Sequence, residues 1–445
     1  YNQIRGESMM KYLSKHKEKL LIILFCFLVS FIVLLFTSKC SFLYPFNDWV
    51  DANAFFTMGK SMMHGLVPYR DLFEQKGPLL YLIYGLGYFF SNTSFLGIFV
   101  LEILFWTFSL YYSYKIITLY LPKNYTYIII PLFTMLLCTS RSFVHGGGAE
   151  EFCLPFLMLS LYYFLFHFKE EEISPKRLIT AGLCAGCVLL IKYTLLGFWF
   201  GFMACIFFHM FFKKEYKKSF VSCLYFLLGM ALPLIISLIY LGLNHAIKDF
   251  IDVYFIVNIT AYNRNSANIF MKLVNIYKGF VGSCYNSGPF ELILVVFVPL
   301  FILPLKMNKS GKKYLIIVYL LSILGIFFGL RFYKYYLFPL LIFMLVSLIG
   351  LFSLCEKFIS KHSKQNIIMK SLTIIALAAS CIFAYTGANY KEFRRVKKEN
   401  LFQYKFSQII NQEPNPTILE MGYVDSGVYT MSGILPNTYL AHIHL

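Results

Sequence analysis

The sequence predicts a polytopic α-helical membrane protein, and three observations support this class. Of its 445 residues 58% are hydrophobic and only 14% are charged, which leaves too little polar side chain to cover a soluble protein. Apolar runs of about 17 to 25 residues, the length that crosses the hydrocarbon core, recur along most of the chain. The basic residues behind the net charge of +18 lie in short clusters between these runs. That pattern is typical of cytoplasmic loops and of contact with anionic membrane lipids, and it argues against nucleic acid as a partner.

The basic N-terminal segment, residues 1–19, is expected in the cytoplasm, so the first span, 20–36, exits on the far side. The run at 79–90 is too short to cross, and we interpret it as an interfacial or re-entrant helix. Counting it as a span would also place two later lysine clusters outside. Without the 79–90 run, the chain is expected to cross the membrane about eleven times and to have its C-terminus outside. The remaining spans are predicted at 95–114, 124–139, 152–168, 178–191, 195–212, 220–242, 290–305, 314–330, 336–354 and 367–386.

The predicted cytoplasmic turns are short and basic, whereas the outer face carries long polar segments. A transmembrane domain therefore covers 20–386, and its outer loops are 40–90, 140–151, 244–289 and 331–335. Beyond residue 387 the hydrophobicity falls and turn residues appear. We expect residues 387–445 to be a small extracytoplasmic domain of mixed α/β character that is incomplete at its C-terminal end.

The segment from Asp48 to Pro78 packs many ionisable side chains between two strongly apolar segments, so it is the first candidate for a functional site. Asp48 and Asp51 are three residues apart and share a face on a helical turn. Phe55, Met58 and Met62 then recur at helical spacing, which predicts a short helix at the membrane interface with Lys60 on another face. The alternative for Asp51 is a structural role as the N-cap of that helix.

Two further outer positions combine charge with an unusual setting. Glu150 and Glu151 follow the triple glycine 146–148 at the start of a span; the glycines allow close backbone approach to a ligand, but carboxylates here also complement a helix dipole. Lys192 lies in the apolar stretch LLIKYTLLGF with no acidic residue nearby in the sequence, a costly placement that favours a functional role. These residues are candidate members of a functional site on the outer face.

Cations also mark the outer end of the span before residue 331. Arg331 and Lys334 lie among four aromatic residues in RFYKYY, a pattern that fits either an interfacial aromatic belt or a site for a phosphate group. Lys76, beside Gly77 and Pro78, is a third possible phosphate contact. Carboxylates and cations gathered on the outer face suit transfer of a sugar from a lipid phosphate.

The first outer loop resembles that of bacterial GT-C glycosyltransferases of the protein O-mannosyltransferase and aminoarabinose transferase type. In that family an Asp-Glu-Gly block precedes a short helix, Gly-x-x-Pro-Tyr-Arg-Asp and Lys-x-Pro-Leu. Here Asp51 falls on the leading acid, GLVPYRD (65–71) on the second block and KGPL (76–79) on the third. Ala52 replaces the usual Glu and Asp48 is an additional acid, so both aspartates are candidate bases and Asp51 is favoured. GGGAEEF (146–152) and RFYKYY (331–336) resemble later loops of the family less specifically.

The resemblance implies a GT-C fold and an inverting transfer of a sugar from a polyprenyl-phosphate donor to a cell-envelope acceptor, such as a glycan, a teichoic acid or a protein, in a bacterial cytoplasmic membrane. It implies Asp51 or Asp48 as the catalytic base. No metal ligand is predicted, although a divalent cation stays open as a cofactor. The candidate phosphate ligands are Lys76, Lys192, Arg331, Lys334 and Arg70, and the candidate sugar or acceptor ligands are Glu150, Glu151, Asp71 and Glu74.

Three alternatives stay open at the level of sequence. A transporter or flippase of lipid-linked sugars would hold ionisable residues near the midplane of several spans. A polysaccharide polymerase would share the lipid donor and the outer site but lack the PYRD and KGP blocks. A non-catalytic scaffold would tolerate replacement of Asp51.

Overall fold

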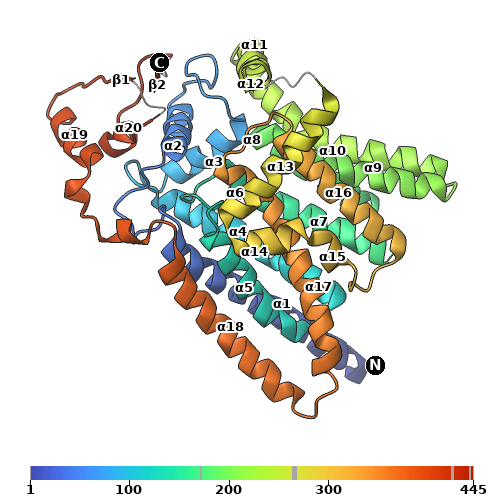
Figure 1. Ribbon diagram of the computed structural model, residues 1–445. Coiled ribbons are helices and arrows are strands. Elements are labelled where there is room, and N and C mark those ends of the chain that lie inside the picture. Colours follow the sequence, from blue (N-terminus) through green and yellow to red (C-terminus); the bar gives the residue numbers. More distant parts are fainter. Residues whose placement is uncertain (1, 171–172, 263–267, 422–424, 440–441, 444–445) are drawn as a thin grey trace.

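Figure 1 shows the computed structural model of the chain, which describes residues 2–170, 173–262, 268–421, 425–439 and 442–443. Helices make up nearly all of its regular structure. The helices that build the bundle are α1 (Asn2–Thr37), α4 (Leu96–Tyr120), α5 (Thr126–Thr139), α7 (Leu154–Glu170), α8 (Pro175–Lys192), α9 (Gly197–Phe212), α10 (Tyr216–Leu243), α13 (Ile269–Ser287), α16 (Lys309–Phe327), α17 (Ile342–Ile359) and α18 (Gln365–Gly387).

Shorter elements connect and cover these helices. The short α-helices are α2 (Val50–Met63), α3 (Pro78–Tyr88), α6 (Ala149–Phe152), α11 (Ile247–Phe250), α12 (Asn258–Tyr262), α14 (Pro289–Glu291), α15 (Val298–Ile302), α19 (Phe402–Ile410) and α20 (Val428–Ser432). The 3-10 segments are η1 (Lys123–Tyr125), η2 (Tyr193–Leu196), η5 (Lys334–Leu341), η6 (Lys391–Arg395) and η7 (Lys398–Asn400), and the π-helical segments are η3 (Ile251–Val257) and η4 (Leu292–Val296). Strands β1 (Glu420–Met421) and β2 (His442–Ile443) pair in parallel.

Eight helices in the described part of the chain are long and apolar enough to cross a membrane. Every predicted span except 124–139 and 290–305 overlaps one of them, and the stretch Pro175–Phe212 contains two predicted spans, which correspond to α8 and α9. The two exceptions have physical causes: α5 has only 14 residues and contains Pro131, and the 290–305 segment is interrupted by the π-helical turn η4. The predicted polytopic helical fold is therefore confirmed.

Local sequence signals set where the spans begin. Pro175 occupies the first turn of α8, and the hydroxyl of Ser174 accepts a hydrogen bond from the backbone N–H of Arg177. The side chain of Asn308 caps α16 in the same way, accepting from the backbone N–H of Gly311 at 2.6 Å. Each cap side chain thus satisfies one of the N–H groups that have no partner within the first turn of an apolar helix.

Glycines let α8 and α10 pack with their backbones almost in contact. A Cβ atom added at Gly182 would lie 1.9 Å from the carbonyl oxygen of Phe226, and one added at Gly229 would lie 1.9 Å from that of Ile179. Small residues at a helix crossing maximise van der Waals contact where lipid removes the hydrophobic drive for association. This packing fixes α8, whose C-terminal end carries Lys192.

The elements that follow the first span gather at the end of the bundle opposite the N-terminus, as Figure 1 shows for α2, α3, α20 and the C-terminal strands. Helix α3 has eleven residues, which confirms that the 79–90 run is too short to cross. Helix α2 packs on α3 so tightly that a Cβ on Gly59 would meet the backbone nitrogen of Gly85 at 2.5 Å. The described part of the C-terminal segment contains short helices and the β1–β2 pair, in agreement with its predicted mixed character.

One expectation about α2 is wrong. The sequence predicts a helix at the interface with Lys60 on a separate polar face, but Lys60 is only 1% exposed. Its ammonium group donates to the carbonyl oxygens of Tyr429 at 3.0 Å and Ile434 at 2.9 Å. The C-terminal segment covers this side of α2 and supplies the polar partners that a buried cation needs.

Candidate active site

Asp51 lies in the first turn of α2 and does not cap it. The N-cap is Trp49, and no side chain caps the start of this helix. Asp51 therefore does not have the capping role that was the alternative to a functional one. The carboxylate is partly exposed, and among the described residues it has no ion-pair partner. Burial raises the pKa of Asp51 above its ordinary value, and the positive charge of Lys76 opposes that rise. An unpaired, partly desolvated carboxylate of this kind can accept a proton.

The KGP block holds Lys76 beside Asp51 and against the end of α8. The backbone N–H of Gly77 donates to the carbonyl oxygen of Ile191 at 3.2 Å. A side chain at Gly77 would strike the carbonyl oxygen of Leu190, 2.0 Å from the added Cβ, so only glycine permits this approach. Burial acts to lower the pKa of Lys76, but the negative charges of Glu74 and Asp51 outweigh it and the pKa is raised. Lys76 is therefore a permanent cation next to the candidate base.

The PYRD block forms a rigid turn behind Lys76. Tyr69 is fully buried and has a φ of 71°, a left-handed conformation that is unusual for a residue with a side chain. Its hydroxyl donates to the carbonyl oxygen of Lys76 at 2.6 Å. Arg70 and Asp71 form an ion pair with Nε–Oδ1 and Nη2–Oδ2 distances of 2.8 Å, and Arg70 also donates to the carbonyl oxygen of Asn244. The described contacts of Arg70 and Asp71 thus connect two outer loops.

Glu74 completes this loop. Its carboxylate accepts hydrogen bonds from the backbone N–H of Lys76, at 2.8 Å, and from the hydroxyl of Tyr81. One of its oxygens lies 3.9 Å from the ammonium nitrogen of Lys76. Glu74 contacts both the backbone N–H and the ammonium group of Lys76, and so it orients that cation relative to Asp51.

Lys192 forms an ion pair with Glu150, and both side chains are almost completely buried. The Lys192 ammonium nitrogen also lies 3.8 Å from the centre of the Tyr336 ring, a cation–π contact. Glu150 and Lys192 both act electrostatically on Asp51, which places the pair in the same site. The C-terminal end of α8 thus contributes a charged pair to the surroundings of the candidate base.

Glu151 has a different position from Glu150, although the two are adjacent in the sequence. Its carboxylate accepts from the backbone N–H of Gly147 at 2.9 Å and from the indole N–H of Trp106 at 2.6 Å. The buried Glu102 accepts from the same Gly147 N–H at 2.6 Å and from the hydroxyl of Ser38. These two carboxylates hold the glycine turn in place, and Gly147, with a φ of 75°, can adopt the required conformation.

Asp48 is engaged elsewhere. It forms an ion pair with Lys39 at 2.5 Å, and the Lys39 ammonium nitrogen lies 3.9 Å from the centre of the Tyr390 ring. The ring of His145 stacks between those of Tyr390 and Trp49, at centroid distances of 4.3 and 5.5 Å. Asp48 therefore helps to join the first outer loop to the C-terminal segment, and the geometry favours Asp51 as the base.

The two cations of the RFYKYY segment lie beside this region. Lys334 begins η5 and is exposed, and its positive charge acts on His145. Arg331 is partly buried just before it. Burial, together with the charges of Lys39 and Lys334, lowers the pKa of His145 to about 2, so this ring is neutral at physiological pH.

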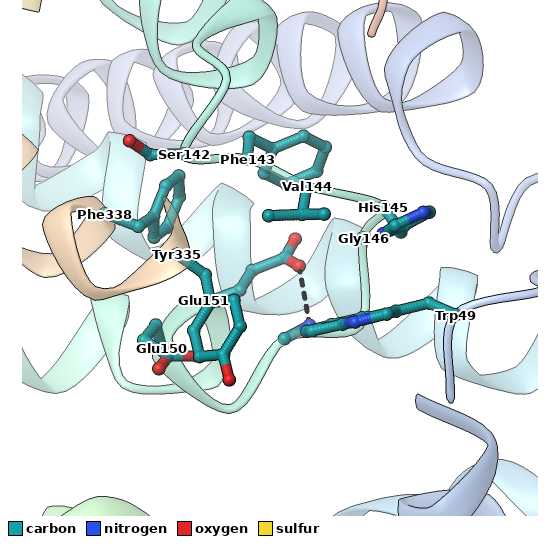
Figure 2. Close-up of a pocket in the computed structure, with 11 residues that line it drawn as sticks. Trp49, Ser142, Phe143, Val144, His145, Gly146, Glu150, Glu151, Tyr335 and Phe338 are labelled. Carbon is teal, nitrogen blue, oxygen red and sulfur yellow. Dashed lines mark hydrogen bonds between the residues drawn. The ribbon is translucent and has the colours of Figure 1, made fainter. Parts of the chain in front are cut away.

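A pocket lies between these groups (Figure 2). The rings of Trp49 and Tyr335 meet edge to face with their centres 5.7 Å apart, and Glu150 and Glu151 line the pocket near them. His145 and the glycine turn line the remaining side. In the described part of the chain no group of three His, Cys, Asp or Glu side chains is arranged to hold a metal ion.

Sequence reasoning missed three members of the site: Glu102, Trp49 and His145. Glu102 carried a usable signal, because a single acidic residue within an apolar span is functional or structural by default. Trp49 and His145 carried none, since their stacking depends on the approach of segments far apart in the chain.

The fold has counterparts among solved structures. ArnT from Cupriavidus metallidurans, crystallised with undecaprenyl phosphate, matches with 10% identity and a TM-score of 0.59 over 95% of this chain and 85% of ArnT. An Archaeoglobus fulgidus oligosaccharyltransferase tethered to an acceptor peptide matches with 13% identity and a TM-score of 0.52, and this chain spans 63% of its length. These likenesses show the GT-C fold, which confirms the resemblance noted in the sequence.

The sequence also defines a narrower relationship. The family model described as "Putative competence-induced protein Ccs4 N-terminal domain" matches residues 7–386, and the chain belongs to this family. No curated protein matches the sequence significantly.

Proposed function

We propose that this protein is an inverting glycosyltransferase that moves a sugar from a polyprenyl-phosphate donor to a cell-envelope acceptor on the outer face of a bacterial cytoplasmic membrane. One observation carries the proposal: the unpaired carboxylate of Asp51 lies beside the cation Lys76 and the Lys192–Glu150 pair. A base next to cations at the outer end of a membrane bundle suits attack on a sugar bound to a lipid phosphate. The GT-C fold supports it.

In this mechanism Asp51 removes the proton from an acceptor hydroxyl as its oxygen bonds to the anomeric carbon. The bond between that carbon and the phosphate oxygen breaks at the same time, and its electron pair leaves with the phosphate. Lys76 and Lys192 stabilise the added negative charge, so the leaving group needs no general acid. A single displacement on the face opposite the phosphate inverts the anomeric configuration.

The other predicted ligands take secondary places in this proposal. Arg331 and Lys334 border the site and supply further positive charge for the lipid phosphate. Arg70, Asp71 and Glu74 support the loop that carries Lys76. The acceptor is a glycan, a teichoic acid or a protein. In this proposal the N-terminus of the chain lies inside the cell and the C-terminus lies outside.

The test compares wild type with Asp51→Asn in a transfer assay that uses a short-chain polyprenyl-phosphate sugar and extracted envelope acceptors. We expect a loss of about 10²- to 10⁴-fold in transfer with unchanged thermal stability, because the carboxylate has no ion-pair partner among the described residues. Asp48→Asn serves as the matched control and should destabilise the protein more than it slows transfer, since Asp48 pairs with Lys39. Full activity of Asp51→Asn would contradict the proposal and favour a scaffold or a transporter.

A further inference from the structure

Glu102 is a buried acid that the proposed mechanism does not use. It lies within α4 and is 0% exposed, and its side chain hydrogen-bonds to that of Glu151, which is 3% exposed. Both side chains also accept from the backbone N–H of Gly147, at 2.6 and 2.9 Å. Neither forms an ion pair with any described residue. Two carboxylates in such contact away from water would repel each other strongly, so at most one of them carries a charge.

The hydrogen-bond donors indicate which of the two acids is ionised. Glu151 accepts from the indole N–H of Trp106 at 2.6 Å and from two backbone N–H groups of the glycine turn, at 2.9 and 3.3 Å. Several N–H donors favour the charged form of a carboxyl group. Among the described residues, Glu102 shares one of these backbone donors and has the hydroxyl of Ser38 as its other donor, at 2.8 Å. This balance favours Glu151 as the carboxylate and Glu102 as a neutral acid whose O–H group donates to it.

Three titratable neighbours surround this pair, and none of them supplies a positive charge. Cys40 in the first outer loop, Tyr84 on α3 and Cys138 on α5 each interact electrostatically with both acids. Thiols and phenols are uncharged near neutral pH, so these side chains cannot neutralise a second carboxylate.

The pair also holds the segment that carries Glu150. Glu151 is the third residue of α6, and its carboxylate accepts from the backbone N–H of the N-cap residue, as in a capping box. Glu150, one residue earlier, pairs instead with Lys192 on α8, and both of those charges act on Asp51. A capping box requires Glu151 but no acid on α4, so Glu102 needs a further explanation.

We propose that Glu102 and Glu151 share one proton, which resides on Glu102, and that this proton positions the start of α6 for sugar transfer. The inference rests on the proposed function and adds Glu102 as a positioning residue, because it acts through α6 and not on the substrate. With the proton in place, a charge-assisted O–H···O hydrogen bond joins α4 to α6. Without it, repulsion between the two acids would displace α6 and with it the Lys192–Glu150 pair beside Asp51.

Infrared spectroscopy tests the shared proton directly. The purified full chain, produced with isotope-labelled glutamate, is measured at neutral pH, where a protonated glutamic acid gives a C=O band that a carboxylate lacks. We expect a band of this kind in the wild type that shifts in heavy water and is missing from Glu102→Gln. Glu413→Gln, at an exposed position, is the matched control and should retain the band. If Glu102→Gln removes no band, the shared proton is overturned.

Transfer kinetics test the positioning role. The amide group of Glu102→Gln can donate to Glu151 as the acid does, so this variant should keep kcat close to the wild-type value. Glu102→Ala removes the donor and should lower kcat by about 10- to 100-fold with little change in the KM for the donor lipid, because misplaced groups around the base slow the chemical step. Glu151→Gln replaces the carboxylate that three N–H groups require, so it should lower both kcat and stability.

The comparison of Glu102→Gln with Glu151→Gln decides the matter even where Glu102→Ala does not fold. Equal impairment of the two glutamine variants, or a Glu102→Ala variant as active as the wild type, would overturn the positioning role. A wild-type band without any transfer would support the shared proton and overturn the transferase. Transfer without the band would leave the transferase standing and overturn the shared proton.

Discussion

Lys192 and Glu150 are 42 residues apart in the sequence and form a buried ion pair at the C-terminal end of α8. The pair resolves the apparent isolation of Lys192 in an apolar stretch. Burial of either charge alone is costly, and their contact offsets part of that cost. The pair also holds the segment that carries Glu150 against the end of α8, where both charges act on Asp51.

The first prediction concerns the stability of this pair. Glu150→Gln and Lys192→Met should each lower the free energy of unfolding by about 3–5 kcal/mol, because each leaves an uncompensated buried charge or polar partner. The double variant should regain most of this loss. Thermal unfolding in detergent measures the effect, with Lys248→Met as the control, since Lys248 pairs with Asp252 in an exposed position and should change nothing measurable. Single variants as stable as wild type would show that the pair is not formed.

The second prediction concerns the pH dependence of transfer. Because burial raises the pKa of Asp51, the rate should rise with pH through a value above the ordinary aspartate range. Lys76 lowers that pKa, so Lys76→Met should shift the acidic limb of the profile to higher pH as well as reduce the maximum rate. A profile of kcat/KM against pH for both proteins provides the measurement. An acidic limb that does not move in Lys76→Met would argue against Asp51 as the titrating base.

The third prediction concerns the approach of the KGP block to α8. Gly77→Ala should destabilise the protein and reduce transfer, because the new methyl group would lie 2.0 Å from a backbone oxygen that cannot move away cheaply. Gly282→Ala is the matched control: no atom lies within 4 Å of its added Cβ, and alanine is favoured in a helix such as α13. Unfolding and transfer are measured for both variants, and equal behaviour of the two would contradict the close approach.

The fourth prediction concerns the cover of α2. Asp425 accepts from the hydroxyl of Thr57 at 2.7 Å, and burial raises the pKa of Asp425 to about 6. The folded protein then holds this proton more tightly than the unfolded chain, whose aspartates titrate near about 3.9. The free energy of unfolding should therefore fall as the pH rises from about 4 to about 6. Burial also lowers the pKa of Lys60 to about 8, below that of a lysine in the unfolded chain. The free energy of unfolding should therefore rise again as the pH increases above about 8.

Thermal unfolding across this pH range checks the effect. Asp425→Asn should remove the slope between about pH 4 and pH 6, while Glu413→Gln, at an exposed position, should keep it. A slope that persists in Asp425→Asn would assign the titration to another group.

The sequence by itself determined the membrane class, the positions of most spans and the loop that carries Asp51. These features follow from local chemistry: apolar runs of sufficient length can cross lipid, and the PYRD and KGP blocks are contiguous in the chain. Tertiary structure decided which charges meet. It paired Lys192 with Glu150, separated Glu150 from Glu151, assigned Asp48 to Lys39 and buried Lys60 beneath the C-terminal segment. Such partners depend on helix packing and on contacts between segments up to 374 residues apart, and no pattern along the chain encodes those distances.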